Sequence, residues 1–230
     1  SDIKEITKLM DECKAIGIAT LGPDVNESVF NFGVNRKGEI RFGLAAIKGM
    51  SEAACNAIIK EREENGPYSS VYDLMERVPA STMNKKALEC LVIAGALDGF
   101  GIRREQYMEP AGNDTFLGML SRYGQQYQTA KNEAVNSLFG GFDAIEITKP
   151  KPPQAEEWSA IERLNKERDL VGIYLSAHPL DEFSIVLECM CNTKCIEIGR
   201  DADREALSKR DLITVGGIVT SSTSRFTKTG

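Results

Sequence analysis

The stretch 42–63, FGLAAIKGMSEAACNAIIKERE, places apolar residues at helical spacing on both sides of a short break at residues 48–51. Leu44 and Ile47 suit a short first helix, and the apolar face of a second helix follows the break. Gly49 can adopt a positive φ at little cost, so the chain can reverse there. The stretch therefore predicts two helices joined by a tight glycine turn.

We call such a glycine turn, together with the start of the helix that follows it, a corner. In a corner, the N–H groups of the turn and of the second helix's first turn point outward together. They attract a phosphate through hydrogen bonds and the helix dipole, without reading bases. This layout is that of a helix-hairpin-helix clamp on the DNA backbone, and the alternative is a purely structural αα-hairpin. The candidate DNA-binding residues of this first corner are Lys48, Gly49, Met50, Ser51, Lys60 and Arg62.

A second corner is expected at Gly99-Phe100-Gly101, which two arginines follow. Cations at a helix start are unfavourable for the helix dipole unless an anion lies nearby. A phosphate would supply that anion, although solvent can screen the charges as well. Since DNA-binding hairpins commonly occur in pairs, the second corner favours DNA contact. Its candidate residues are Gly99, Gly101, Arg103 and Arg104.

The composition is that of a globular chain, with 230 residues, 42% hydrophobic and 27% charged. A net charge of -6 argues against a generally basic nucleic-acid coat, so any DNA contact must come from local clusters. No apolar run is long enough to cross a bilayer, and no signal-peptide pattern occurs. The lack of such a run leads us to expect no membrane partner. Six cysteines are too sparse for a disulfide framework, and with no secretion signal we expect a cytoplasmic protein.

The pattern predicts a mainly α fold with a small β portion. A β-hairpin of SVFNFGV and EIRFGL precedes the corners, Ser70 and Asn84 can cap helices, and LITVGGIVT has β-branched enrichment. KPKPPQAEE (149–157) is a proline-rich connector, and the chain ends suggest a piece of a longer protein. The expected segments are the hairpin region 1–43, the paired corners 44–123, a flexible connector 124–157, a helical segment 158–210 and a β segment 211–230.

A zinc site and a catalytic histidine are both disfavoured. Cys189, Cys191 and Cys195 with His178 lack the spacing of common structural zinc sites, and the cysteines fall where helix core residues would lie. His178 before a proline is more simply a helix-terminating residue with a satisfied hydrogen bond. Nucleotidyl transfer needs closely placed carboxylates for two metal ions, and no strand-borne aspartate pair occurs. We therefore expect no catalytic residue and no metal here.

Several motifs occur in an order and spacing that chance does not easily produce. They are FGLAAIKGM with AIIKERE, NKKALECLVIAGALD with FG and an arginine, LVGIYLSAHPLDEF, and VGGIVTS with TKTG. Together with ECKAIGIATLGPDVNES, they resemble the C-terminal half of the alpha subunits of bacterial replicative DNA polymerase III, the C-family polymerases. The resemblance covers most of residues 11–190 and again 212–230.

The resemblance implies a segment that runs from the end of the fingers through tandem helix-hairpin-helix motifs into the start of an OB-fold. Ser51 departs from the family, which usually has a glycine there. The family also carries a sliding-clamp motif, which here retains Ser137, Leu138 and Phe139, while Val135 replaces its glutamine. The alternative for this segment is a chain folded back on its own core.

By the same resemblance, Arg225, Phe226 and Lys228 would bind single-stranded DNA at the start of the OB-fold. The family's catalytic aspartates and their Mg²⁺ lie in the palm, outside this segment, so this chain alone should not polymerise DNA. Expected partners are duplex DNA, the sliding clamp and other replicase subunits in DNA replication. The alternatives are a non-catalytic repair or recombination scaffold with the same hairpins, and a structural interaction module.

Overall fold

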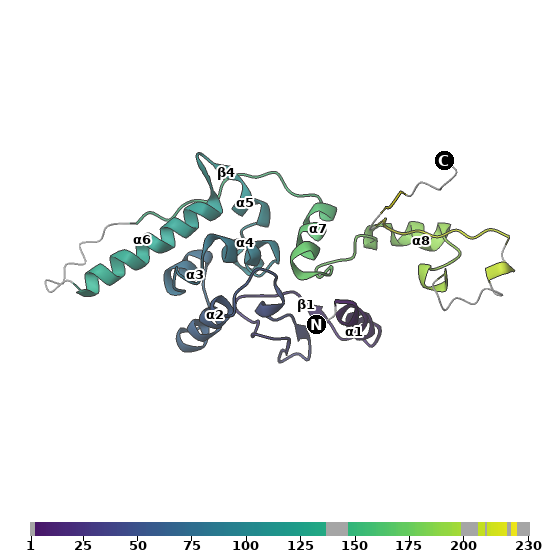
Figure 1. The fold of residues 1–230 in the computed structure, drawn as a ribbon, viewed down its shortest axis with the longest axis horizontal. Coiled ribbons are helices and arrows are strands. Elements are labelled where there is room, and N and C mark those ends of the chain that lie inside the picture. Colours follow the sequence, from purple (N-terminus) through teal and green to yellow (C-terminus); the bar gives the residue numbers. More distant parts are fainter. Residues whose placement is uncertain (1–2, 137–146, 199–206, 210, 220–221, 225–230) are drawn as a thin grey trace. The chain divides into compact units, whose positions relative to one another are not determined.

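A computed structural model describes residues 3–136, 147–198, 207–209, 211–219 and 222–224 of the chain. The chain divides into two compact units, Ser1–Ser176 and Ala177–Gly230. The first unit contains most of the helices (Figure 1). No helix in the described ranges combines the length and the apolar character that a membrane crossing requires. The mainly α fold with small sheets is confirmed.

The first unit opens with helix α1 (Ile3–Ala15) and a small three-stranded sheet. Strand β2 (Gly33–Val34) pairs antiparallel with β3 (Ile40–Arg41), which confirms the expected hairpin. On its other side β3 pairs in parallel with β1 (Thr20–Leu21), in register Thr20 to Ile40. This parallel partner was not predicted, because a two-residue strand carries no periodicity in the sequence.

The helical core begins after β3, and its first predicted helix is only a 3₁₀ turn, η1 (Leu44–Ala46). Helices α2 (Glu52–Asn65), α3 (Val71–Arg77) and α4 (Lys85–Ile93) follow. Each begins at a side-chain cap, since an oxygen of the preceding residue accepts a hydrogen bond from the helix's first turn. The two caps expected at residues 70 and 84 are confirmed.

These helices share one apolar core, because each presents a buried stripe to the others. Next come a second 3₁₀ turn, η2 (Asp98–Phe100), and the short helix α5 (Arg104–Met108). Strands β4 (Pro110–Ala111) and β5 (Asp114–Thr115) then form a tight hairpin. Fully buried members of the core include Leu44, Ile58, Leu74, Met75, Leu88, Leu91 and Phe116.

Helix α6 (Phe116–Asn136) is the long teal helix of Figure 1 and packs along α3, α4 and α5. It crosses the boundary expected at 123/124 without a break. Its Gln128 donates hydrogen bonds to the carbonyl oxygens of Met75 (2.8 Å) and Val78 (2.7 Å). These bonds fix the middle of α6 to the end of α3, so the flexible connector does not begin at residue 124.

The proline-rich residues 149–157 belong to the first unit and are bonded to its helices α3 and α5. The Tyr72 hydroxyl donates to the Pro150 carbonyl at 2.6 Å, and the Gln106 amide donates to the Pro153 carbonyl at 2.8 Å. Lys149 also forms an ion pair with Glu76 at 3.0 Å. Proline-rich chains leave their carbonyls unpaired, so side-chain donors can hold them. Helix α7 (Ala160–Val171) follows.

The second unit has the 3₁₀ turns η3 (Asp181–Phe183) and η4 (Cys195–Ile198) on either side of helix α8 (Ser184–Met190). Residues 211–219, expected as a strand, pair with no strand in the described part of the chain. They are held instead by Asn192, whose side chain donates to the Leu212 carbonyl at 2.7 Å. A β-branched segment forms a ladder only when a partner strand supplies its hydrogen bonds.

Candidate functional site

The first corner, residues 48–51, is a turn between η1 and α2 that requires glycine. Gly49 has φ +89°, a region that other residues rarely adopt. A Cβ atom at Gly49 would also lie 2.8 Å from Sγ of Cys90, which is buried in α4. The reversal expected from the sequence is therefore present, and its inner side is closed by α4.

Ser51, where the resemblance led us to expect a glycine, caps α2. Its φ is -85°, and its hydroxyl accepts the N–H of Ala54 at 3.2 Å. The N–H groups of Gly49, Ser51, Glu52 and Ala53 donate to no other group in the described part of the chain. Helix α2 has 14 residues, so its dipole adds to these outward donors. The corner can thus accept an anion.

Two lysines flank this corner. Lys48 is exposed, yet its N–H donates to the Leu170 carbonyl at 3.0 Å and its ammonium group to the Asp169 carbonyl at 3.3 Å. Lys86 reaches the corner from α4, since a Cβ atom at Gly49 would lie 3.7 Å from its Cε. Lys86 is exposed and forms no ion pair within the described residues. Sequence reasoning missed it, because only the packing of α4 brings it to the turn.

The other two cations predicted for the first corner lie away from it. Lys60 is eight residues from the start of α2, about 12 Å along the axis, and pairs with Glu64 at 3.8 Å. Arg62 donates to the carbonyl oxygens of Val25 (2.7 Å) and Ser28 (2.9 Å). The Arg62 guanidinium therefore stabilises the loop before β2. These acceptors are more than 30 residues away, so the spacing of residues near Arg62 could not predict them.

The second corner, residues 99–104, also turns at a glycine. Gly101 has φ +72° and no heavy atom within 4 Å of its added Cβ, so the turn needs glycine for its backbone alone. The N–H of Arg103 donates to Oε1 of Gln106 at 3.1 Å. Helix α5 after it has only five residues, too short for a strong dipole.

Arg104 turns inward rather than toward a ligand, with 8% of its surface exposed. Its guanidinium donates to both oxygens of Asp98, with a shortest distance of 2.6 Å, and to the Ile93 carbonyl at 3.1 Å. It also lies 3.5 Å from Glu167 of α7. Burial disfavours its charged form, but Asp98 and Glu167 outweigh burial and raise the pKa of Arg104.

Arg103 is likewise matched by carboxylates. It lies 3.5 Å from Glu105 and 3.9 Å from Glu157, and it donates to the Ala155 carbonyl at 2.9 Å. We expected a phosphate to offset the arginines of this corner, and the structure instead offsets them with side chains of the chain itself. Asp98 and Glu105 are near the arginines in the sequence, whereas Glu157 and Glu167 are more than 50 residues away and become partners only through the fold.

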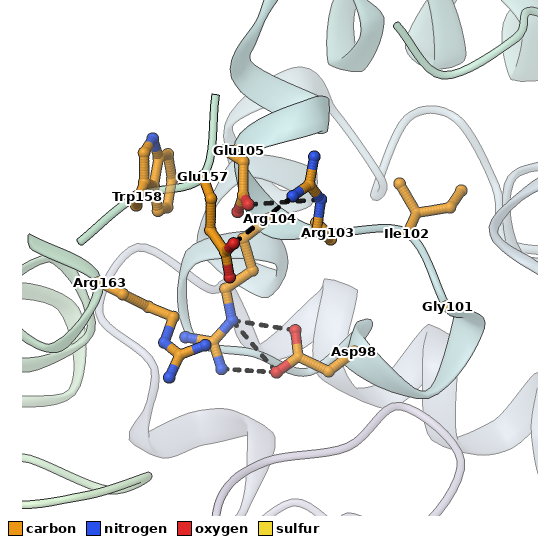
Figure 2. Close-up of a pocket in the computed structure, with 9 residues that line it drawn as sticks. All are labelled: Asp98, Gly101, Ile102, Arg103, Arg104, Glu105, Glu157, Trp158 and Arg163. Carbon is orange, nitrogen blue, oxygen red and sulfur yellow. Dashed lines mark hydrogen bonds and ion pairs between the residues drawn. The ribbon is translucent and has the colours of Figure 1, made fainter. Parts of the chain in front are cut away.

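These groups line a cavity of about 250 Å³ at the second corner (Figure 2). Figure 2 shows the two arginine side chains directed to different carboxylates. Arg163 of α7 also faces the cavity and has no ion pair within the described residues. The lining residues are Asp98, Gly101, Ile102, Arg103, Arg104, Glu105, Glu157, Trp158 and Arg163. Because acidic and basic groups balance here, the cavity does not favour an anion as the first corner does.

Two predicted sites lie outside the described residues. These are the clamp motif at Ser137, Leu138 and Phe139 and the single-strand site at Arg225, Phe226 and Lys228. Within the described part of the chain, no three residues of the metal-ligating types gather around one point. His178 accepts the Leu180 N–H at Nδ1 (3.2 Å), so its expected hydrogen bond is present. It does not terminate a helix as expected, because α7 already ends at Val171.

Comparison with known proteins identifies relatives of this chain. Residues 17–107 match the family model described as the helix-hairpin-helix motif, a span that contains both corners. The DNA polymerase III subunit alpha of Vibrio cholerae is 32% identical over 229 residues, which is 99% of this chain. That of Escherichia coli K12 is 30% identical over 234 residues, again 99% of the chain, and that of Treponema pallidum is 37% identical over 178 residues, or 77%.

The matched region is a minor part of each relative. It covers 19% of the Vibrio and Escherichia proteins and 15% of the Treponema protein. The resemblance inferred from the motifs is confirmed.

Proposed function

Because this chain is similar over nearly its whole length to one segment of the DNA polymerase III alpha subunit, we propose that its first unit holds the sugar-phosphate backbone of duplex DNA. The proposal rests on the arrangement of hydrogen-bond donors at the first corner. There, outward N–H groups at the start of a 14-residue helix lie beside Lys48 and Lys86. Backbone donors and ammonium groups recognise phosphate oxygens and carry no sequence information.

Several finer roles follow from the resemblance. Within a replicative polymerase, such a clamp would hold the newly formed duplex behind the catalytic centre. The segment with Ser137, Leu138 and Phe139 would bind a sliding clamp through its apolar pair. Catalytic aspartates and Mg²⁺ would be supplied by another part of the enzyme, so this chain by itself would not polymerise DNA.

The proposal is tested by titrating labelled duplexes with the chain and following fluorescence anisotropy. Two duplexes of unrelated sequence should bind equally, and log K should fall linearly with log salt. Lys48→Glu and Lys86→Glu should each weaken binding to both duplexes and reduce the salt slope by about 0.9 for each phosphate that is no longer neutralised. Lys60→Glu is the matched control, because Lys60 is an exposed lysine on α2 that pairs with Glu64.

Arg103→Glu tests whether the second corner contributes to duplex binding in addition to the first. If the second corner also grips the backbone, combining Arg103→Glu with Lys48→Glu should weaken binding further than Lys48→Glu alone. We expect little added effect, because Arg103 already faces two carboxylates. Equal affinity of the wild type and the Lys48→Glu and Lys86→Glu variants on both duplexes would refute the proposal. A sliding-clamp pull-down that still succeeds in that case would favour an interaction module.

A further inference from the structure

Glu167 of α7 is the most deeply buried acidic residue among those described, with 1% of its surface exposed. Its Oε2 accepts three hydrogen bonds from the chain segment that follows α7. The donors are the Leu175 N–H at 3.2 Å, the Ser176 N–H at 3.1 Å and the Ser176 hydroxyl at 3.0 Å. One carboxylate oxygen therefore fixes the last residues of the first unit, which ends at Ser176.

The other oxygen of Glu167 faces the second corner. Oε1 lies 3.5 Å from Nη1 of Arg104, which is itself 8% exposed. A buried carboxylate is strongly disfavoured unless a counterion and hydrogen bonds compensate it. Here Arg104 supplies the charge, while Leu175 and Ser176 supply the hydrogen bonds. The second corner and the end of the unit thus depend on the same side chain.

The C-terminal end of α7 is held at the first corner as well. The carbonyl oxygens of Leu170 and Asp169 accept hydrogen bonds from the N–H and the ammonium group of Lys48. A cation at a helix C-terminus is favourable for the dipole. Helix α7 therefore contacts both corners, and the chain leaves the unit four residues after its αL cap at Gly172.

We infer that Glu167 is a positioning residue that sets where the chain leaves the first unit, and that Arg104 serves as its counterion rather than as a phosphate contact. The second corner then anchors α7 and residues 175–176 to the helix-hairpin-helix core. Whatever follows Ser176 starts from a fixed point of that core. This inference stands on the contacts of Glu167 and is independent of DNA binding at the first corner.

The test is hydrogen–deuterium exchange of the full chain, read at the amides of Leu175 and Ser176. In Glu167→Gln the new amide oxygen can replace Oε2, but the amide nitrogen then faces the Arg104 guanidinium, donor against donor. Exchange at these two amides should rise at least about tenfold. Glu162→Gln is the matched control, since Glu162 is an exposed residue of α7 paired with Lys166 at 3.4 Å, and it should leave both amides unchanged.

A rescue distinguishes positioning from general stability. In Arg104→Met combined with Glu167→Gln, no guanidinium opposes the new amide nitrogen, and the amide oxygen can still accept from residues 175–176, so exchange there should return toward the wild-type rate. Duplex affinity of this double variant should stay within about twofold of the wild type, because neither residue contacts phosphate. Lys48→Glu, in contrast, tests the first corner, so each proposal can fail separately.

Three results would overturn the inference. They are unchanged exchange at residues 175–176 in Glu167→Gln, a uniform rise across the amides of α2 and α4 with no rescue, and a large loss of duplex affinity in the double variant. If Glu167→Gln does not fold, Ser176→Ala removes only the hydroxyl donor. It should then raise exchange at Ser176 by about threefold, and no change there would count equally against the inference.

Discussion

Replacing Gly49 with alanine should test the geometry of the first corner directly. Two effects oppose the substitution. A non-glycine residue held at φ +89° costs about 1–2 kcal/mol of backbone strain. Its Cβ would also lie 2.8 Å from Cys90 Sγ, an overpacking that typically costs about 1–3 kcal/mol.

One effect favours the substitution. Alanine reduces the freedom of the unfolded chain, which stabilises the fold by about 0.4–1 kcal/mol. The net expectation for Gly49→Ala is a loss of about 1–5 kcal/mol in the free energy of unfolding. Gly101→Ala has a similar positive φ but open space around its Cβ, so we expect only about 1 kcal/mol there. The difference between the two variants isolates the contact with Cys90.

Urea unfolding followed by tryptophan fluorescence is a suitable assay, because the chain has a single tryptophan, Trp158, in the first unit. Both variants should shift the midpoint without changing the slope. Adding Cys90→Ala to each glycine variant completes a double-mutant cycle. The sulfur is removed, so Cys90→Ala should recover about 1–2 kcal/mol in Gly49→Ala and nothing in Gly101→Ala.

Equal losses for Gly49→Ala and Gly101→Ala would refute this reasoning. So would a cycle with no coupling between positions 49 and 90, since the packing of α4 against the turn would then be absent.

Further predictions concern single side chains. Ser51→Ala should destabilise the fold by about 1 kcal/mol, measured as a loss of melting temperature, because it removes the cap of α2, whereas Ser51→Asp should retain it. Tyr107→Phe should be neutral or stabilising by up to about 1 kcal/mol in the same measurement, because the buried Tyr107 hydroxyl has no hydrogen-bond partner among the described residues. Burial tends to raise the pKa of Asp73, but hydrogen bonds from Ser69 and Arg77 outweigh it and lower the pKa below 3.8. Stability from Asp73 is therefore complete above about pH 4 and falls as the pH drops through the lower folded pKa, and Asp73→Asn should flatten unfolding curves recorded between pH 2 and 5.

The local features of the two corners could be predicted from the sequence, because they depend on short-range chemistry. Glycine was expected to reverse the chain at residue 49, and φ +89° agrees. The caps at Ser70 and Asn84 were expected from residue type and spacing, and both accept the hydrogen bond that defines a cap. Such features involve residues within one turn of each other, so their partners are visible in the sequence.

The partners of the charged residues could not be predicted in the same way. The sequence placed Arg62 and Arg104 among the cations expected to contact phosphate. Arg62 instead bonds to carbonyls 34 and 37 residues away, and Arg104 meets Glu167 of α7. A long cationic side chain selects whichever acceptor the fold brings near it, and that acceptor is set by the packing of distant elements.

By itself, the sequence determined the helical class, the glycine turns, the helix caps and the polymerase resemblance, since all of these follow from neighbouring residues or from motif order. Only the tertiary structure decided which charges remain available to a ligand. It brought Lys86 to the first corner, neutralised the second corner with carboxylates, and bonded the proline-rich segment to the core. The physical reason is that electrostatic and hydrogen-bond pairing depends on distance in space, and residues far apart in the chain become neighbours only when the helices pack.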